Sequence, residues 1–398
     1  MPVEDDGIDE FVCQAQRSGA ASSGHHNLNY VLPLPERPAQ LIGSEQGTPV
    51  LVRVPRAEAA SVVIRTWRNE ADLLESLKGL LPHAPRCLAR TATATVLTYV
   101  AGTPFSRVCP DGKPVDSLYI SDMAHLLAQT TAVRREALPP LPGYWPRDDQ
   151  DSRSYLRTLA LSADRQIRQP NWPAYGGLLN ALGIAEDALV RLAEHVPAMT
   201  RRPYGLLHAD LHRDNLVITD HGNPRLIAVD WELATYGDPL YDLATHLVRM
   251  RYPESQKAEV IAAWAGAVAS VTPAAADGLD RDLPRYIAFE QAQSAFPDIV
   301  RTASSLAWSP HQEDLDKVLH EAALSVHRAL EDAAEPLRLH AIPNADKVRD
   351  LLRPWQAPSP DNWSPPRTVQ PVGPHHEKLD PDAQDAVGDG QAGCPAFA

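Results

Sequence analysis

The stretch from Tyr204 to Leu243 decides how this chain is interpreted. It reads Tyr204-Gly-Leu-Leu-His-Ala-Asp-Leu-His-Arg-Asp-Asn-Leu-Val-Ile218, then a turn, then Leu226-Ile-Ala-Val-Asp-Trp-Glu232 and, shortly after, Tyr236-Gly-Asp-Pro-Leu-Tyr-Asp-Leu243. Two apolar, strand-like runs flank the turn cluster Asp220-His-Gly-Asn-Pro224, which predicts a hairpin. The hairpin places Asp210 and Asn215 before one strand and Asp230 directly after the other.

The spacing of these polar residues is that of a kinase-type catalytic loop. Asp210 and Asn215 fit the pattern H-x-D-x-x-x-x-N, and Asp230 follows the hairpin at the position of a metal-binding aspartate. Phosphoryl transfer needs one carboxylate to accept the proton of the attacking hydroxyl, and a second carboxylate with a carbonyl oxygen to hold magnesium. The pattern therefore predicts Asp210 as the catalytic base, and Asn215 and Asp230 as Mg²⁺ ligands. A lone aspartate is more often a turn or capping residue, but the combined spacing favours function.

A second match to H-R-D lies within the same stretch, at His212-Arg213-Asp214. Five residues beyond Asp214 is Thr219, a poor magnesium ligand, whereas five residues beyond Asp210 is Asn215, a good one. We therefore expect the register of Asp210 to carry the chemistry.

Together, these motifs resemble the aminoglycoside phosphotransferase family, relatives of the protein kinases that move the terminal phosphate of ATP or GTP onto hydroxyls of small molecules. The resemblance spans about residues 20 to 330 and is strongest over His208–Asn215, Val229–Glu232 and Gly237–Leu243. It implies an α+β, two-lobed protein-kinase-like fold with a small antiparallel β lobe and a larger, mostly helical lobe. The expected divisions are a nucleotide-binding lobe at 1–102, a catalytic and substrate lobe at 103–335, and a Pro-rich, partly disordered tail at 336–398.

The resemblance also assigns residues to the nucleotide phosphates. A loop at Ser23 and Gly24 would cover them with backbone N–H groups, although an ordinary hairpin explains the same letters equally well. Kinase folds place a cation on the strand that here runs from 49 to 55, and its only basic residue is Arg53. Arginine binds phosphate through a planar fork, so its geometry differs from that of lysine. Glu70, on a helix predicted over 66–79, is the expected partner of Arg53, with a solvated helix glutamate as the alternative.

The strand predicted over 92–102 ends in a sequence that resembles the family's hinge. There the backbone from Thr98 to Val100 would hydrogen-bond an adenine, with no side-chain signature required.

Apolar spacing predicts a helical remainder after the hinge. The predicted helices are 116–135, 152–168, 184–196, 244–251, 254–270, 282–300 and 311–330. Residues 1 to 20 show no clear period, so a short helix and a loose end are both open.

Composition sets limits on compartment and partners. The 398 residues carry a formal net charge of −14, which argues against nucleic acid and is compatible with a cationic substrate. The four cysteines lack a C-x-x-C spacing. No run approaches the roughly 18 apolar residues of a membrane helix. The stretch Met1-Pro-Val-Glu-Asp-Asp6 has neither the basic start nor the apolar segment that an export signal needs. We expect a cytoplasmic enzyme with no membrane or nucleic-acid partner, using Mg²⁺ and either ATP or GTP.

Three functions stay open on the sequence. The first is phosphorylation of a hydroxyl on an aminoglycoside-like antibiotic. The second is a metabolic or biosynthetic kinase of choline, a sugar or a natural-product intermediate. The third is a nucleotide-binding pseudoenzyme, against which the complete set of Asp210, Asn215 and Asp230 argues.

Overall fold

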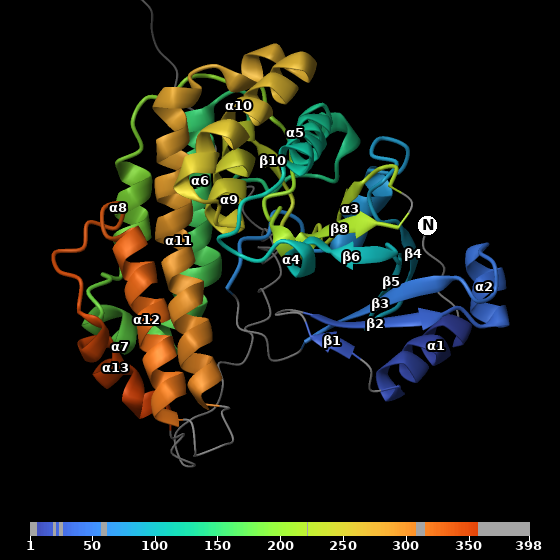
Figure 1. The fold of residues 1–398 in the computed structure, drawn as a ribbon, viewed down its shortest axis with the longest axis horizontal. Coiled ribbons are helices and arrows are strands. Elements are labelled where there is room, and N and C mark those ends of the chain that lie inside the picture. The colour runs from blue at the N-terminus through green and yellow to red at the C-terminus, as the bar shows by residue number, and fades with distance from the viewer. Residues whose placement is uncertain are drawn as a thin grey trace, which may run out of the picture. The chain divides into compact units, whose positions relative to one another are not determined.

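The computed structural model describes residues 6–18, 21–23, 27–56, 62–220, 222–307 and 315–356 (Figure 1). All of them fall within one compact unit, Met1–Thr368. The architecture is α+β, as predicted: an antiparallel sheet precedes a mostly helical part that carries two small sheets. The residue boundaries of the two predicted lobes stay a prediction.

Five strands form the sheet of the N-terminal part, in the spatial order β1-β2-β3-β5-β4, and every neighbouring pair is antiparallel. The strands are β1 (Ala21–Ser23), β2 (Asn27–Pro33), β3 (Pro49–Pro55), β4 (Cys87–Arg90) and β5 (Thr95–Thr98). Three helices accompany them: α1 (Asp6–Arg17), α2 (Glu36–Ile42) and α3 (Glu70–Ser76).

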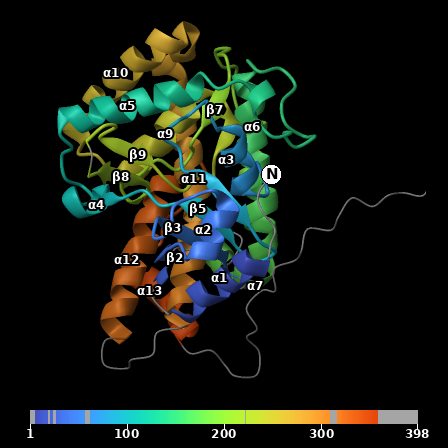
Figure 2. The same ribbon diagram turned by 90° about the vertical axis from the view of Figure 1, so that its right-hand side faces the viewer.

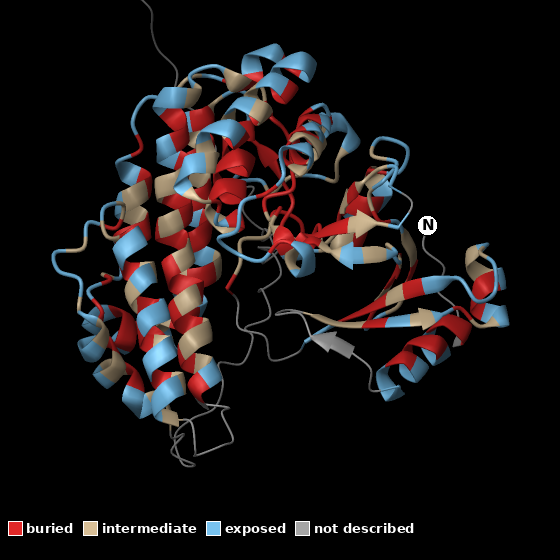
Figure 3. Cartoon of the chain, viewed as in Figure 1, coloured by how far each residue is buried: buried red, intermediate tan, exposed pale blue. Residues whose placement is uncertain are grey.

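Helix α1 resolves the choice that the sequence left open for the N-terminus. Its buried residues, Ile8, Phe11, Val12 and Ala15, recur at the spacing of one helix face. They share a hydrophobic core with the sheet (Figures 1 and 3). The apolar pattern was therefore present, but it consists of only four residues, Ile8 to Ala15.

Alternation along β3 decides what each face of the sheet contacts. Val50, Val52 and Val54 are buried in the core that includes α1. Successive strand residues point to opposite faces, so Arg53 points away from α1. It meets the first turn of α3, which Asn69 caps by accepting a backbone N–H.

The C-terminal part builds two small sheets among its helices. Its strands are β6 (Gly102–Pro104), β7 (Gly205–Leu207), β8 (Leu216–Thr219), β9 (Leu226–Ala228) and β10 (Thr235–Gly237), arranged as β6-β8-β9 and β10-β7. The helices are α4 (Phe105–Val108), α5 (Ser117–Thr131), α6 (Ser152–Ala163), α7 (Gln169–Ala181), α8 (Ala188–Glu194), α9 (Pro239–Met250), α10 (Glu254–Val271), α11 (Leu279–Ala307), α12 (Leu315–Ala333) and α13 (Ala345–Leu352). Helix α5 lies beside α10, and α11 packs against both α9 and α12 (Figures 1 and 2).

The hairpin and most helices were predicted, with ends shifted by a few residues. The predicted helix 152–168 is α6 followed by a π-helical turn, Asp164–Arg168. Helix α7 was missed because Pro170 and Pro173 interrupt its pattern, although proline is tolerated near a helix start. Residues 311–314 of the last predicted helix lie outside the described residues.

The first part of the predicted tail is folded. Helix α13 packs on α12, and Leu352 at its end is fully buried. Just beyond it, Trp355 stacks on Tyr175 with 4.9 Å between ring centroids. Residues 357–398 lie outside the described residues. Within the described part of the chain, no helix is long and apolar enough to cross a membrane.

Candidate active site

A buried carboxylate holds the backbone of the loop between β7 and β8. Asp242, in the first turn of α9, accepts hydrogen bonds from the backbone N–H groups of His208 (2.9 Å) and Ala209 (2.7 Å). Ala209 has φ of 57°, in the left-handed region that residues with a Cβ rarely adopt. Burial raises the pKa of Asp242 to about 6, against the opposing effect of the two N–H donors. The contact fixes the strained turn immediately before Asp210.

One face of α9 carries further polar contacts to this loop. Asp242, His246 and Arg249 are four and three residues apart and therefore project from the same side of the helix. His246 Nδ1 donates to the carbonyl of Leu211 at 2.8 Å, and Arg249 forms an ion pair with the carboxylate of Asp210. Burial lowers the pKa of His246 to about 4, so its ring is neutral at neutral pH. Helix α9 thus holds both the backbone and the carboxylate of the loop.

Both carboxylate oxygens of Asp210 are engaged. Oδ1 accepts from Arg249, and Oδ2 accepts from Asn215 Nδ2 at 3.0 Å. The same nitrogen of Asn215 also donates to the backbone carbonyl of Asp210, at 2.9 Å. Asn215 therefore presents its carbonyl oxygen away from Asp210, as a metal ligand requires.

A separate ion-pair cluster surrounds Arg53. Its Nη1 lies 2.5 Å from Glu70 Oε2 and 3.0 Å from Asp230 Oδ1, and its Nε donates to Asn29 at 3.3 Å. The other oxygen of Glu70 accepts the backbone N–H of Trp231 at 2.8 Å. Burial acts to lower the pKa of Arg53, but the carboxylates of Glu70 and Asp230 raise it above its ordinary value. The structure thus brings the predicted pair Arg53 and Glu70 together, at Asp230.

Asp230 is placed by its backbone as well as by this ion pair. Its φ is 65°, the second left-handed residue of the site that is not glycine. Two residues on, Glu232 accepts from Arg65 Nη2 at 2.8 Å and from Asn27 Nδ2 at 3.1 Å. Burial and the neighbouring Asp230 raise the pKa of Glu232. The segment after β9 is therefore tied to the first residue of β2.

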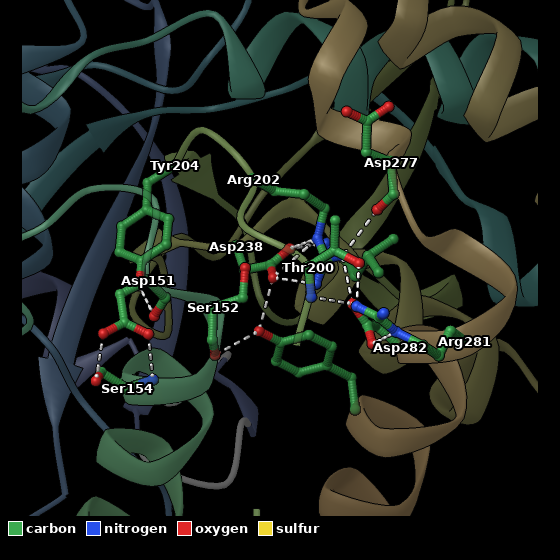
Figure 4. Close-up of polar contacts among 12 residues, drawn as sticks. Asp151, Ser152, Ser154, Thr200, Arg202, Tyr204, Asp238, Asp277, Arg281 and Asp282 are labelled. Atoms are coloured by element: carbon green, nitrogen blue, oxygen red, sulfur yellow. Dashed lines mark hydrogen bonds and ion pairs between the residues drawn. The ribbon is translucent and has the colours of Figure 1, made fainter. Parts of the chain in front are cut away.

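The start of α9 is fixed by a buried ionic network (Figure 4). Asp238 caps the helix by accepting the N–H of Leu240, and it receives two nitrogens of Arg202 at 2.7 to 3.0 Å. Arg202 also binds Asp282 of α11 at 2.8 Å, and the side chains of all three charged residues are at most 2% exposed. Burial lowers the pKa of Arg202, but Asp238 and Asp282 raise it above its ordinary value. The Gly-Asp-Pro motif of the sequence thus has a structural role here.

A cavity of about 590 Å³ opens over the loop between β7 and β8 and the segment after β9. Asp210, Asn215 and Asp230 line it from the loop side, and Gln293, Asp298 and Asp332 from α11 and α12. Among the lining residues that the structure describes, seven are carboxylates and three are arginines. The described part of the cavity is therefore acidic.

The structure bears on the choice of register. The side chain of Asp214 is 73% exposed and Asp210 is 14% exposed. Arg213, only 1% exposed, donates to the carbonyls of Cys109, Lys113 and Met250 and so anchors neighbouring segments. Asp210 and Asn215 lie in contact and Arg213 is a structural residue, while the register that carries the chemistry stays a prediction.

The remaining nucleotide residues are less well placed. Gly24 lies outside the described residues, and of Ser23 only its place in β1 is described. Thr98 ends β5, where its backbone N–H donates to the carbonyl of Arg86 at 2.9 Å. That amide is therefore engaged within the sheet. The contact of the backbone from Thr98 to Val100 with an adenine stays a prediction.

Sequence analysis missed Arg249, His246 and Glu290. Asp242 was quoted as part of a motif but was given no role. A signal for the first two was present: polar residues at i, i+4 and i+7 from Asp242, in a helix whose other residues are mostly apolar. Glu290 carries no such signal because its partner Arg249 is 41 residues away in the chain.

The residues present suit a magnesium ion shared with nucleotide phosphates. The described residues contain no group of three or more His, Cys, Asp or Glu side chains that could hold a metal ion. Magnesium commonly needs only one or two carboxylates together with phosphate oxygens and water. The hydrogen bonds found in the described part of the chain engage Oδ1 of Asp230, and Asn215 presents its amide oxygen.

Comparison with known proteins places the chain in a family. The sequence pattern of the phosphotransferase enzyme family matches residues 21–279. No curated protein matches the chain significantly. The chain is similar to a macrolide 2′-phosphotransferase from Brachybacterium faecium (19% identity, 84% of this chain, 100% of that chain, TM-score 0.45). It is also similar to a choline kinase from Streptococcus pneumoniae (15% identity, 82% of this chain, 99% of that chain, TM-score 0.47). A third similar structure is an aminoglycoside phosphotransferase from Streptomyces rimosus (14% identity, 72% of this chain, 98% of that chain, TM-score 0.42).

The family match covers more than half of the chain and includes Asp210, Asn215 and Asp230. The chain therefore belongs to the phosphotransferase enzyme family, as a small-molecule phosphotransferase with an alcohol group as acceptor.

Proposed function

We propose that this enzyme transfers the terminal phosphate of ATP or GTP to a hydroxyl of a small cationic acceptor, with an aminoglycoside-like antibiotic as the first candidate. The observation that carries the proposal is the acidic cavity over Asp210, in which carboxylates outnumber arginines by seven to three. A cationic acceptor gains favourable charge interactions in such a cavity, and a neutral or anionic acceptor does not.

In this proposal Asp210 orients the acceptor hydroxyl and takes its proton. Its carboxylate is held from two sides, by Arg249 and Asn215, so little reorientation is needed during the reaction. Arg53 binds the phosphates with Glu70 as its anchor, and the hinge backbone near Val100 contacts the base. A cytoplasmic location and the division into lobes at 1–102 and 103–335 belong to the same proposal.

Asn215 and Asp230 would hold Mg²⁺. The ion, when bound, neutralises charge on the phosphates during transfer. The contact between Arg53 and Asp230 supports this assignment, because two side chains in contact could both reach one phosphate group. Asp230→Ala should therefore weaken nucleotide binding in the presence of magnesium. Nucleotide titrations with and without magnesium check this, and an unchanged magnesium dependence would place the ion elsewhere.

A panel assay tests the function. The purified protein is incubated with MgATP or MgGTP and with aminoglycosides, choline, neutral sugars and anionic sugar phosphates, and phosphorylated product is detected by mass. We expect product with a polycationic acceptor and none with Asp210→Asn. Product with choline alone would indicate the metabolic alternative. A protein that binds nucleotide but phosphorylates no acceptor would contradict the proposal in favour of a pseudoenzyme.

A further inference from the structure

Glu290 is a buried glutamate that lies behind the cavity wall. It sits on α11 with 0% exposure, and it is not among the residues that line the described cavity. Its Oε1 accepts from Arg249 Nε at 2.8 Å and from Ser294 Oγ at 3.3 Å, and its Oε2 accepts from Gln293 Nε2 at 3.0 Å. Both oxygens are therefore directed by named donors.

Arg249 uses two separate nitrogens for its two carboxylates. Nε donates to Glu290, and Nη1 contacts Asp210. Since the guanidinium is planar and rigid, fixing Nε also fixes the direction of Nη1. Burial lowers the pKa of Arg249, but Glu290 and then Asp210 raise it above its ordinary value, so the group stays charged.

We propose that Glu290 is a positioning residue for phosphotransfer, which acts through Arg249 to set the carboxylate of Asp210 toward the acceptor hydroxyl. This inference rests on the proposed function. Glu290 touches neither acceptor nor nucleotide. Glu290 affects the orientation of the base, so its loss should lower kcat and leave nucleotide affinity unchanged.

The chain offers a closely matched control. Asp164 is also a buried carboxylate, 4% exposed, that binds an arginine (Arg168, 2.8 Å) and a glutamine (Gln169 Nε2, 2.7 Å). It lies in the π-helical turn between α6 and α7, and it is not among the residues that line the active-site cavity. Asp164→Asn removes the same kind of charge from the same kind of environment without a path to Asp210.

The test compares kcat and nucleotide KM of Glu290→Gln and Asp164→Asn at a temperature where both are folded. We expect kcat of Glu290→Gln to fall by about tenfold or more, the usual effect of one charge-assisted hydrogen bond, with nucleotide KM unchanged. Asp164→Asn should keep both constants even if its melting temperature falls. Glu290→Asp, which keeps the charge on a shorter side chain, should recover part of the loss and serves if Glu290→Gln does not fold.

A double mutant completes the test. Combined with Arg249→Met, Glu290→Gln should cause no further loss of kcat, because both act through one contact. Wild-type kcat in Glu290→Gln, an equal loss in Asp164→Asn, or additive losses in the double mutant would overturn the inference. An unmutated enzyme that phosphorylates no acceptor and hydrolyses no nucleotide would overturn the proposed function, and this inference with it.

Discussion

Two arginines hold two carboxylates of the candidate active site, Asp230 and Asp210, in the same manner but from different parts of the fold. Arg53 on β3 joins Asp230 to Glu70 of α3, and Arg249 on α9 joins Asp210 to Glu290 of α11. In each case the glutamate is the buried anchor: the Glu70 side chain is 10% exposed and Glu290 is fully buried. The first cluster faces the proposed metal and phosphates, and the second faces the acceptor. Mutations in the two clusters should therefore affect different kinetic constants: nucleotide KM for the first cluster and kcat for the second.

The largest expected effect is on Asp210, where the second cluster ends. Asp210→Asn should lower kcat by roughly 10²–10⁴-fold, the usual contribution of a general base, and leave nucleotide binding nearly intact. Steady-state kinetics and nucleotide titration check this. Asp214→Asn is the control for register and should be mild because that side chain is mostly exposed. A mutant that keeps more than about a tenth of wild-type turnover would remove Asp210 from the role of base.

Next comes Arg249, whose loss should affect both catalysis and stability. Arg249→Met leaves Glu290 buried without its cation, so the free energy of unfolding should fall by about 3–5 kcal/mol. Urea denaturation measures that loss, and kinetics at a permissive temperature should show a lower kcat at constant nucleotide KM. A raised nucleotide KM with normal kcat would erase the difference between the two clusters.

For Arg53 the effect should be smaller and appear in nucleotide use. Arg53→Ala should raise nucleotide KM or lower kcat by about 10- to 100-fold, as expected for the loss of a charge-assisted hydrogen bond. Arg53→Lys should restore only part, because lysine lacks the planar fork whose Nη1 contacts Glu70 and Asp230 while Nε donates to Asn29. Glu70→Gln should give the same phenotype and add little to Arg53→Ala. Fully additive losses would break the proposed pairing, and wild-type behaviour would make Arg53 a structural residue.

The last effect concerns stability and not turnover: it is the pH dependence of the free energy of unfolding near the second cluster. Burial lowers the pKa of His208 and of His246 to about 4, from an ordinary value of 6.5. A histidine held neutral in the fold stabilises it above pH 6.5, and this stability is lost as the pH falls from about 6.5 to about 4. Asp242, whose pKa burial raises to about 6, acts in the opposite direction over much of this range.

Chemical denaturation from pH 7 to pH 4 measures the balance. The two histidines together outweigh Asp242, so we expect a net loss of roughly 3 kcal/mol over the range, at 1.36 kcal/mol for each unit of pKa shift. His246→Asn should flatten the curve. A protein equally stable at both ends would show that these rings are not held neutral.

The sequence allowed the first cluster to be predicted, and the structure was needed for the second. Asp230 occupies a position whose spacing carries a known chemical requirement, and Arg53 and Glu70 were paired from the family resemblance, whereas the contact of Arg53 with Asp230 was not predicted. Glu290 depends on α11 packing beside α9, a tertiary contact that no local pattern encodes. The left-handed backbone at Ala209 and Asp230 was equally hidden, because alanine rarely adopts it and aspartate, although enriched there, adopts it in only a small share of positions.

The helices and strands show the same contrast between what a local pattern predicts and what tertiary packing decides. The hairpin and the long amphipathic helices follow from local apolar spacing. Helix α7 did not, because its prolines break the local pattern and packing against the rest of the chain overrides it. Helix α1 has the apolar spacing of a helix face, so its pattern was available in the sequence.

The face of α9 that carries Asp242, His246 and Arg249 also limits how this enzyme can change in length. Inserting or deleting one residue between Asp242 and Arg249 would rotate everything beyond it by about 100°. Arg249 would then leave Asp210, even though no side chain of the site had been altered. A substitution in α9 can weaken the contacts to the loop by a small or a large amount. A change in the number of residues removes the contact between Arg249 and Asp210 altogether. Among related enzymes this helix should therefore vary in composition while keeping a constant number of residues between the carboxylate and the arginine.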